Sequence, residues 1–264
     1  MPLLENMKWP DVEKNLKIND IAVIPVGAME QHGKHMPFKT DTEIARAVSI
    51  RIGKNTKALV IPTIQFGLST HHMKFPGTIT LTNFTFINLI TDICDSLIKH
   101  GFKNMLIINA HGGNTPLLTE ATRSFYQKNR RKTKIYLVQV LSLAQQLIDF
   151  NINTFKKGHS DRREASVMLY LSPETVDLDL VEKKNMLQKE YIDEHLTKRI
   201  KKVNLDAVEF NGCTINSIFD TDEVSKTGGW GSLEETSAAF GEKIIEVTSN
   251  YLIDFINELG NGLD

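Results

Sequence analysis

The sequence predicts an α/β fold, a single domain in which helices flank a mostly parallel β-sheet. Four apolar runs of strand length alternate with segments of helical periodicity in the first 141 residues of the 264-residue chain. Such alternation produces right-handed crossovers between parallel strands. The runs are continuously apolar, which is typical of strands covered on both faces. No linker, repeat or low-complexity tract divides the chain, so residues 1–264 are expected to form one domain.

Four segments are predicted as the strands of this sheet, because each is short and rich in Val, Ile and Leu. Their apolar runs are far shorter than the roughly 20 residues that a membrane-spanning helix needs. The predicted strands are residues 21–27, 58–64, 104–110 and 134–141.

Apolar residues at helical spacing predict the elements between and after these strands. Asn83 is a good N-cap for one of these helices, and Gly101 lies just past its end. Asn114 is expected to cap the next, with Pro116 tolerated in its first turn. The predicted helices are residues 41–54, 83–100, 115–129, 164–171 and 234–259, and most of residues 175–230 receives no assignment.

Charge and cysteine content exclude several classes of protein. The 31 Lys+Arg residues balance 32 Asp+Glu residues to a net charge of −1, so the excess of cations that a nucleic-acid binder needs is missing. Cys94 and Cys213 make neither a disulfide framework nor a cysteine-type zinc site. The polar N-terminal segment predicts no signal peptide. We therefore expect a cytoplasmic protein with no nucleic-acid or membrane partner.

Polar side chains gather where the predicted strands end. In open α/β sheets, ligands bind outside the carboxyl ends of the strands. Five of the eight histidines lie in segments that leave the first three predicted strands, whereas His100 and His195 have the setting of ordinary helix residues. The sequence therefore predicts the functional site at this edge of the sheet. The five are His32, His35, His71, His72 and His111.

Glu30, His32 and Asp41 form the first candidate cluster. In an extended loop, residues two apart project to the same side, so Glu30 and His32 could face one cation. Asp41 lies where the next helix begins. Capping of that helix is its alternative role, and the two roles are compatible. The alternative for Glu30 and His32 is simple solvent exposure.

His111 and Glu164 are further candidates. His111 directly follows a predicted strand and precedes Gly112 and Gly113, which permit close backbone approach. A plain turn with His111 bonded to a backbone carbonyl is the alternative. Glu164 opens an apolar helix, where a favourable charge at the helix N-terminus is its alternative role. His159 precedes that helix in a polar loop, and its alternative is solvent exposure.

Together the candidates supply two histidines and three carboxylates, which suit hard or borderline divalent ions. A bridging carboxylate with two mixed His/carboxylate sets is how two-metal hydrolases hold metals roughly 3.5–4 Å apart.

Glycine-containing turns occur at 75–78 and 228–231. Trp230, between glycines of the second turn, is interpreted as a pocket wall or as a core or interface residue.

Five motifs make the chain similar to the creatininase (creatinine amidohydrolase) family. They occur in family order within residues 21–241 and read PVGAMEQHGKHMPFKTD, FPGTITL, NAHGGN, GHSDRREAS and GGWGS. The resemblance implies an α/β fold with two metal ions (zinc, manganese or iron) at the C-termini of a parallel sheet. It also implies hydrolysis of non-peptide or unusual C–N bonds, and commonly a homohexamer.

The resemblance assigns the metal ligands residue by residue. Asp41 would bridge both ions, with Glu30 and His111 completing one site and His32 and Glu164 the other. Metal binding lowers the pKa of water from 15.7 to about 7, which supplies hydroxide to attack an amide carbon. One metal would polarise the carbonyl and stabilise the oxyanion.

His159, five residues before Glu164, aligns with the family's catalytic histidine. It would carry a proton to the leaving nitrogen, a task that suits an unperturbed pKa of about 6.5. Backbone N–H groups near Gly112 and Gly113 are a further candidate for substrate binding.

The chain departs from true creatininases at several positions. They carry a Tyr-Glu pair where this chain has Gly112 and Gly113, and a tryptophan before the catalytic histidine where it has Phe155 or its neighbours. Both departures argue against creatinine as the substrate. The Gly-Gly version is shared with relatives that deformylate formamidopyrimidines or process peptides. The third motif is more basic, so Arg162 or Arg163 is interpreted as a partner for an anionic substrate.

We therefore predict a dinuclear metal-dependent hydrolase of a non-peptide or cyclic amide C–N bond in a small-molecule substrate. The alternative is a metal-binding accessory protein of the same fold that has lost catalysis. A phosphate-binding regulatory domain built on the turn at 112–114 is a third interpretation, although that turn lacks P-loop and dinucleotide-binding spacing. Cys94 and Cys213 are expected to be dispensable. His35, His71 and His72 are expected to support the ligands or line the pocket.

Overall fold

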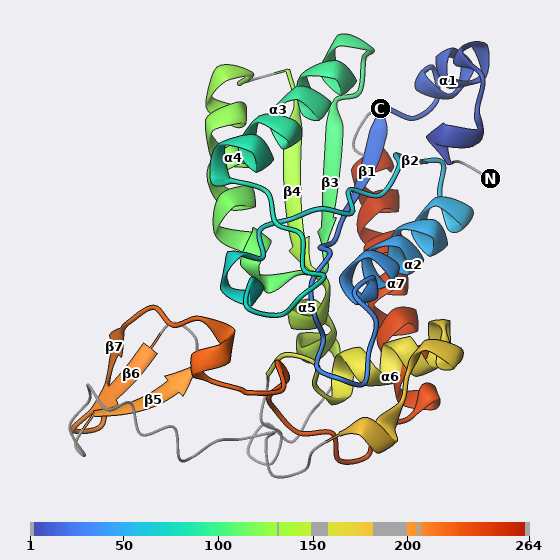
Figure 1. Cartoon of the computed structure of the whole chain (residues 1–264). Helices are drawn as coiled ribbons and strands as arrows, with labels where there is room; N and C mark the ends of the chain where they lie inside the picture. The colour runs from blue at the N-terminus through green and yellow to red at the C-terminus, as the bar shows by residue number, and fades with distance from the viewer. Residues whose placement is uncertain (1–2, 131, 149–157, 182–199, 205–206, 262–264) are drawn as a thin grey trace.

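The computed structural model describes residues 3–130, 132–148, 158–181, 200–204 and 207–261. In these ranges four parallel strands form one sheet in the order β2-β1-β3-β4, and three antiparallel strands form another in the order β5-β6-β7 (Figure 1). The predicted α/β class and its parallel sheet are confirmed. The strands are β1 (Ile21–Val26), β2 (Leu59–Val60), β3 (Asn104–Asn109), β4 (Lys134–Gln139), β5 (Ile200–Asn204), β6 (Ala207–Phe210) and β7 (Cys213–Asn216).

Helices cover both faces of the parallel sheet, as crossovers between parallel strands require (Figure 1). The α-helices are α1 (Trp9–Leu16), α2 (Thr40–Asn55), α3 (Asn83–Lys99), α4 (Thr115–Lys128), α5 (Val140–Leu147), α6 (Arg162–Leu171) and α7 (Ala238–Asn261). Single 3-10 turns occur at Leu4–Asn6, Thr70–His72, Gly112–Asn114, Pro173–Thr175, Leu178–Leu180 and Thr221–Glu223.

Burial on both faces explains the continuous apolar runs of the central strands. Ile21 and Val23 of β1 pack with α2, α5, α6 and α7 on one face. Ala22 and Ile24 of the same strand pack with α3, α4 and part of α1 on the other. The parallel register of β1 with β3 brings their carboxyl ends to the same edge, where Val26 is opposite Asn109. The loops that leave these two strands therefore meet at that edge.

Two predicted strands extend too far. Within residues 58–64 only Leu59–Val60 pairs as a strand, because Pro62 has no N–H for the ladder, and Ile64 then returns to Val26 through a single bridge. The strand predicted at 134–141 ends at Gln139. The side chain of Gln139 accepts a hydrogen bond from the Ser142 N–H and starts α5.

One predicted helix cap is wrong, and a second lies at the expected position without the expected side-chain bond. Thr82, not Asn83, caps α3, because its hydroxyl accepts a hydrogen bond from the Thr85 N–H. Asn114 precedes α4 without a side-chain capping bond. Its amide instead donates to the Gly27 carbonyl, which connects the ends of β1 and β3.

The starts of α6 and α7 also differ from prediction. Helix α6 begins at Arg162 because the Asp161 carboxylate accepts a hydrogen bond from the Arg163 N–H and caps it. Helix α7 begins at Ala238 and not at 234, since Glu235 has a φ of 58° and cannot continue a right-handed helix.

The antiparallel sheet β5-β6-β7 occupies part of the segment that the prediction left unassigned. Asn211 and Gly212 form the turn between β6 and β7 with φ values of 50° and 79°. Asn-Gly is a strong hairpin signal that the prediction missed, as it also missed α1 and α5. Phe155 and His195 lie outside the described residues. None of the described helices is long and apolar enough to cross a membrane.

Helices α6 and α7 pack closely against each other. Gly241 of α7 makes this possible, because a Cβ there would overlap the Ser166 carbonyl of α6. Helix α6 carries Glu164 in its first turn, so this contact helps to set the position of a candidate site residue.

We expect Gly241→Ala to destabilise the protein by about 1–3 kcal/mol through overpacking of α6 against α7. Gly260→Ala is the matched control, since nothing lies within 4 Å of the added Cβ in the same helix. It should change stability by less than about 1 kcal/mol. Urea denaturation of both variants measures the difference, and equal stability would contradict the packing argument.

Candidate metal centre

A buried group of histidines and carboxylates occupies the edge of the sheet where β1 and β3 end. Glu30 and His32 lie on the loop after β1, and Asp41 lies in the first turn of α2. His111 directly follows β3, and Glu164 lies in the first turn of α6. All five side chains are buried, Glu30 and His32 completely. The structure therefore brings together the five residues that the sequence predicts as ligands.

Asp41 lies between the two histidines. Its Oδ1 is 3.3 Å from His32 Nε2 and its Oδ2 is 3.3 Å from His111 Nδ1. Asp41 does not cap α2, because the N-cap position belongs to Lys39. Each oxygen of one carboxylate thus faces a different histidine, which is the geometry of a bridging ligand.

The other two carboxylates flank this pair from opposite sides. Glu30 Oε1 is 3.1 Å from His111 Nδ1, and Glu164 Oε2 is 3.9 Å from His32 Nε2. One half of the site therefore contains Glu30 and His111, and the other contains His32 and Glu164. This is the same division that the resemblance implies.

Backbone carbonyls orient both histidines. His32 Nδ1 is 3.1 Å from the Glu30 carbonyl, and His111 Nε2 is 2.9 Å from the Leu68 carbonyl. A carbonyl only accepts, so these nitrogens carry the protons in the neutral rings. The lone pairs of His32 Nε2 and His111 Nδ1 then point at Asp41. Metal-binding histidines usually have such a partner on the second nitrogen.

Four buried atoms in the centre have no hydrogen-bond partner within the part of the chain that the structure describes. They are both carboxylate oxygens of Glu30, Oδ2 of Asp41 and Nε2 of His32. A buried polar group without a partner is costly. Cations would satisfy all four at once, and a donor set of nitrogen and oxygen fits zinc, manganese or iron. The residues present therefore fit divalent metal ions.

The charges of the cluster also favour cations. Burial alone would lower the pKa of His32, but Asp41, Glu164 and Glu30 outweigh it and raise that pKa to about 9. Burial is likewise outweighed at His111, where Glu30 and Asp41 raise the pKa. Burial raises the pKa of Glu164 to about 7. Three buried carboxylates thus hold positive charge on the histidine rings.

His159 is buried beside this cluster and not exposed. Its Nε2 is 2.7 Å from the Gln31 carbonyl, and its Nδ1 is 3.7 Å from Glu30 Oε1. Two backbone hydrogen bonds of 2.9 Å each join it to Trp230. Burial and the neighbouring His32 lower the pKa of His159 to about 3, which keeps the ring neutral. The pKa is therefore not the unperturbed value of about 6.5 expected from the sequence.

A cavity of about 570 Å³ opens beside the cluster. This volume is in the range of small-molecule sites. Trp230 lines the cavity, which settles its interpretation as a pocket wall. Other lining residues are His71, His72, His111, Gly112, Gly113, Gln139, His159, Glu164, Phe219 and Asp220.

The structure corrects the interpretation of Arg162. Its guanidinium pairs with Glu235 at 2.8 Å and lies over the Phe240 ring, and Arg162 does not line the cavity. Arg163 lines the cavity, but its guanidinium forms a buried ion pair with Asp161. Its charge is therefore matched within the protein.

Sequence reasoning missed Gln31, whereas His72 lies where it was expected, beside a candidate ligand and in the cavity lining. His72 Nε2 is 3.5 Å from Glu30 Oε1, and Gln31 contacts both His72 and His159. The position of Gln31 between Glu30 and His32 was the available signal. His35 lies farther out, where its Nε2 is 3.1 Å from the Ser160 carbonyl. Cys94 is buried among α3 and α4 side chains, and Cys213 is exposed on β7.

The fold is α/β, and its cluster of buried histidines and carboxylates lies at the strand ends. These features define a class of metal-site proteins. Comparisons with known proteins identify the family. The family model for creatininase, described as creatinine amidohydrolase, matches residues 5–256. Creatinine amidohydrolase from Pseudomonas putida is 30% identical over 191 residues, which cover 66% of this chain and 74% of that relative. The chain belongs to the creatininase family.

Other relatives show the breadth of the family. The mycofactocin precursor peptide peptidase of Mycolicibacterium smegmatis is 28% identical over 165 residues, or 60% of this chain and 61% of the peptidase. A creatininase variant described as Zn-Zn type is 25% identical with a TM-score of 0.74 and covers 97% of both chains. A structure described as creatininase Mn is 25% identical with a TM-score of 0.71 and also covers 97% of both. These relatives are thus named as an amidohydrolase, a peptidase and creatininases, and a further relative from Thermotoga maritima is named as a 3-dehydro-scyllo-inosose hydrolase.

We expect zinc binding to release at least one proton per chain at about pH 8. The pKa of His32 is about 9 and that of His111 is raised, whereas a histidine must be neutral to bind metal. Zinc affinity should therefore weaken as the pH falls, because protons compete for the same nitrogens. Calorimetry in buffers of different ionisation enthalpy measures the release, and proton uptake would contradict it.

Proposed function

We propose that this protein is a dinuclear metal-dependent hydrolase of a C–N bond. Glu30 and His111 would hold one divalent ion and His32 and Glu164 would hold the other, with Asp41 shared between them. The observation that supports this most directly is the pair of 3.3 Å contacts from the two oxygens of Asp41 to different histidines. Family membership and the metal descriptions of two similar structures agree with it.

Bound ions of this kind supply Lewis-acid polarisation of the scissile carbonyl and a water of lowered pKa. The chain itself supplies proton transfer. His159 donates its Nε2–H to the Gln31 carbonyl, so its Nδ1 lone pair faces the cluster. Nδ1 accepts a proton from the attacking water and delivers it to the leaving nitrogen as the C–N bond breaks. The ring ends the cycle neutral, as it began.

The loop from 158 to 161 holds His159 rigidly. The Asp161 carboxylate accepts from the Gly158 N–H at 2.9 Å and pairs with Arg163. A Cβ at Gly158 would overlap the Trp230 backbone, so the two segments are in close contact. The catalytic nitrogen is thereby fixed against the Glu30 side of the site.

The cavity favours a small-molecule amide, including a cyclic amide, as the substrate. Its aromatic residues include Trp230 and Phe219, and its polar groups include carboxylates, histidines and the backbone at Gly112 and Gly113. Glycine at 113 replaces the carboxylate that true creatininases carry there, which argues against creatinine. The cavity and the retained His159 favour an enzyme over an accessory protein that has lost catalysis. The single domain over residues 1–264, the cytoplasmic location and the homohexamer stay predictions.

We expect two divalent ions per chain by elemental analysis after expression with zinc or manganese. Asp41→Asn should lose most of both, because it weakens the ligand shared by the two sites. Glu30→Gln and Glu164→Gln should each lose about one ion. Glu174→Gln, an exposed carboxylate outside the site, is the control and should keep both. A wild-type protein without metal would contradict the proposal.

We expect His159→Ala to keep the metal content of the wild type and to lower turnover by about 10²–10⁴-fold, the usual contribution of a positioned acid–base group. A panel of formamides, cyclic amides, ureas and short peptides supplies the substrates. Unchanged turnover in the variant would show that the assigned proton carrier is wrong. Absence of turnover for the entire panel by the metal-loaded wild type would favour the accessory protein.

A further inference from the structure

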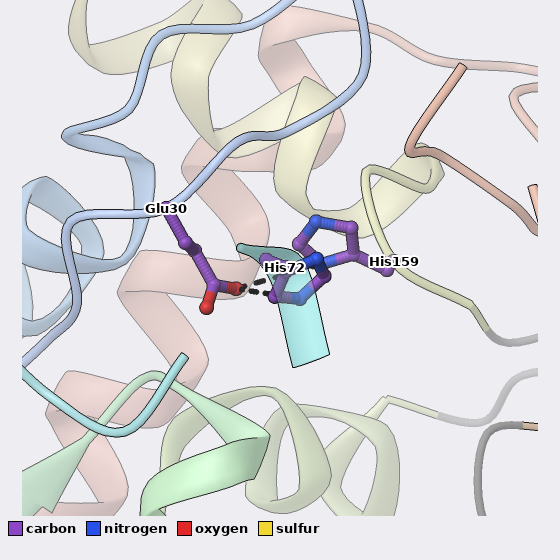
Figure 2. A group of neighbouring side chains, drawn as sticks. All are labelled: Glu30, His72 and His159. Carbon is purple, nitrogen blue, oxygen red and sulfur yellow. Dashed lines mark ion pairs between the residues drawn. The ribbon is translucent and has the colours of Figure 1, made fainter. Parts of the chain in front are cut away.

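Glu30, His72 and His159 form a second buried trio beside the proposed metal pair (Figure 2). One potential ligand atom from each lies within 4.8 Å of the others. Both histidine edges face the same oxygen, Glu30 Oε1, from 3.5 Å for His72 Nε2 and 3.7 Å for His159 Nδ1. By composition the trio resembles a third metal site. The positions of the imidazole protons decide whether it can be one.

Gln31 determines these positions, and two backbone groups fix its side-chain amide. Gln31 Oε1 accepts a hydrogen bond of 2.8 Å from the Gly33 N–H, and Gln31 Nε2 donates one of 3.0 Å to the Gly228 carbonyl. An N–H can only donate and a carbonyl can only accept. The reverse orientation of the amide would oppose both partners.

The fixed amide sets the tautomer of His72. Gln31 Nε2 is 2.8 Å from His72 Nδ1, and it is a donor, so His72 Nδ1 must accept. The Thr221 hydroxyl lies 2.9 Å from the same nitrogen and is also able to donate to it. A protonated His72 would place N–H against N–H, so the ring is neutral with its proton on Nε2. Burial and the nearby His159 also lower the pKa of His72.

The backbone of the same residue sets the tautomer of His159. Its Nε2 donates to the Gln31 carbonyl, and Nδ1 is left with a lone pair. The two rings therefore present opposite polarity to Glu30 Oε1. His72 presents an N–H, and His159 presents a lone pair.

We propose that His72 is a positioning residue whose Nε2–H faces the Glu30 carboxylate from 3.5 Å and attracts its charge without a hydrogen bond, and that Gln31 fixes the tautomers of His72 and His159 together. The trio is then not a third metal site, because His72 has no lone pair to offer on the side of Glu30. The inference rests on the proposed function only in taking Glu30 as a metal ligand. In this proposal the Gln31 amide donates a hydrogen bond to His72 Nδ1. A glutamate at this position could only accept, so it would favour the tautomer with the proton on Nδ1.

The arrangement also gives the turn at 228–231 a role in the site. Gly228 has a φ of 86°, and a Cβ there would overlap the Gln31 amide. Its carbonyl holds the amide in place, and the Trp230 ring lies 6.4 Å from the His72 ring. A segment almost 200 residues away in sequence from Gln31 thus controls the proton positions beside Glu30.

The first test reads the tautomers directly in the full-length, metal-free protein labelled with ¹⁵N. Long-range ¹H–¹⁵N correlation distinguishes protonated from unprotonated imidazole nitrogens. We expect His72 and His159 both to be protonated at Nε2 and unprotonated at Nδ1, with assignment by His72→Gln and His159→Gln. Gln31→Glu should move the His72 proton to Nδ1, whereas Gln65→Glu, at an exposed position, should not. His72 protonated at Nδ1 in the wild type would overturn the proposal.

The second test measures zinc affinity by competition with a chromogenic chelator. His72→Phe keeps a ring but loses the N–H, and it should weaken zinc binding by about 10–100-fold, as loss of such a partner typically does. His72→Gln can place an N–H near the original Nε2 and should restore most of the affinity. His100→Phe, an exposed histidine at the end of α3, should have no effect.

The outcomes separate the inference from the proposed function. Equal zinc affinity for wild type and His72→Phe, or no rescue by His72→Gln, overturns the positioning role. A wild type that binds no zinc contradicts the proposed function instead, while the tautomers measured in the metal-free protein still support or refute the task of Gln31.

Discussion

The position of the Asp41 carboxylate between His32 and His111 is the constraint on which the rest of the site depends. Its two oxygens lie 3.3 Å from nitrogens that come from different strand ends. That placement requires the N-terminus of α2 to meet the end of β1 closely, and Gly27 permits it, because a Cβ there would lie 2.5 Å from the Thr42 nitrogen. Burying Asp41 among two further carboxylates is costly without cations, so the geometry and the charge favour the same occupants.

Backbone groups do much of the orienting in this site. Carbonyls of Glu30, Leu68 and Gln31 accept from His32, His111 and His159 in turn, and each contact leaves one lone pair directed at the centre. The loops that follow β1 and β2 supply these carbonyls, so the imidazole rings are oriented before any ligand binds. The four histidines nearest the carboxylates are therefore not interchangeable. His32 and His111 offer lone pairs to the metals, His159 offers one to a proton, and His72 offers an N–H.

Much of the fold follows from local pattern. Continuous apolar runs predict β1 and β3 almost to the residue, because both strands are buried on both faces. Elements whose ends depend on single side chains are predicted less well. Pro62 shortens β2, and the left-handed Glu235 delays α7. The hairpin of β6 and β7 was missed because its strands are short and partly exposed, so neither shows a clear apolar pattern.

The sequence by itself determined the α/β class and the edge of the sheet that carries the site, because residues next to strand ends share an edge whatever the details of packing. Its motifs also named five candidate ligands, through their resemblance to the creatininase family. Only the tertiary structure decided the proton positions and the partners of the arginines. Gln31 orients His72 through Gly228, nearly 200 residues away, and Arg162 finds Glu235 on another segment. Hydrogen-bond direction depends on which groups the fold brings together, and no spacing along the chain specifies that.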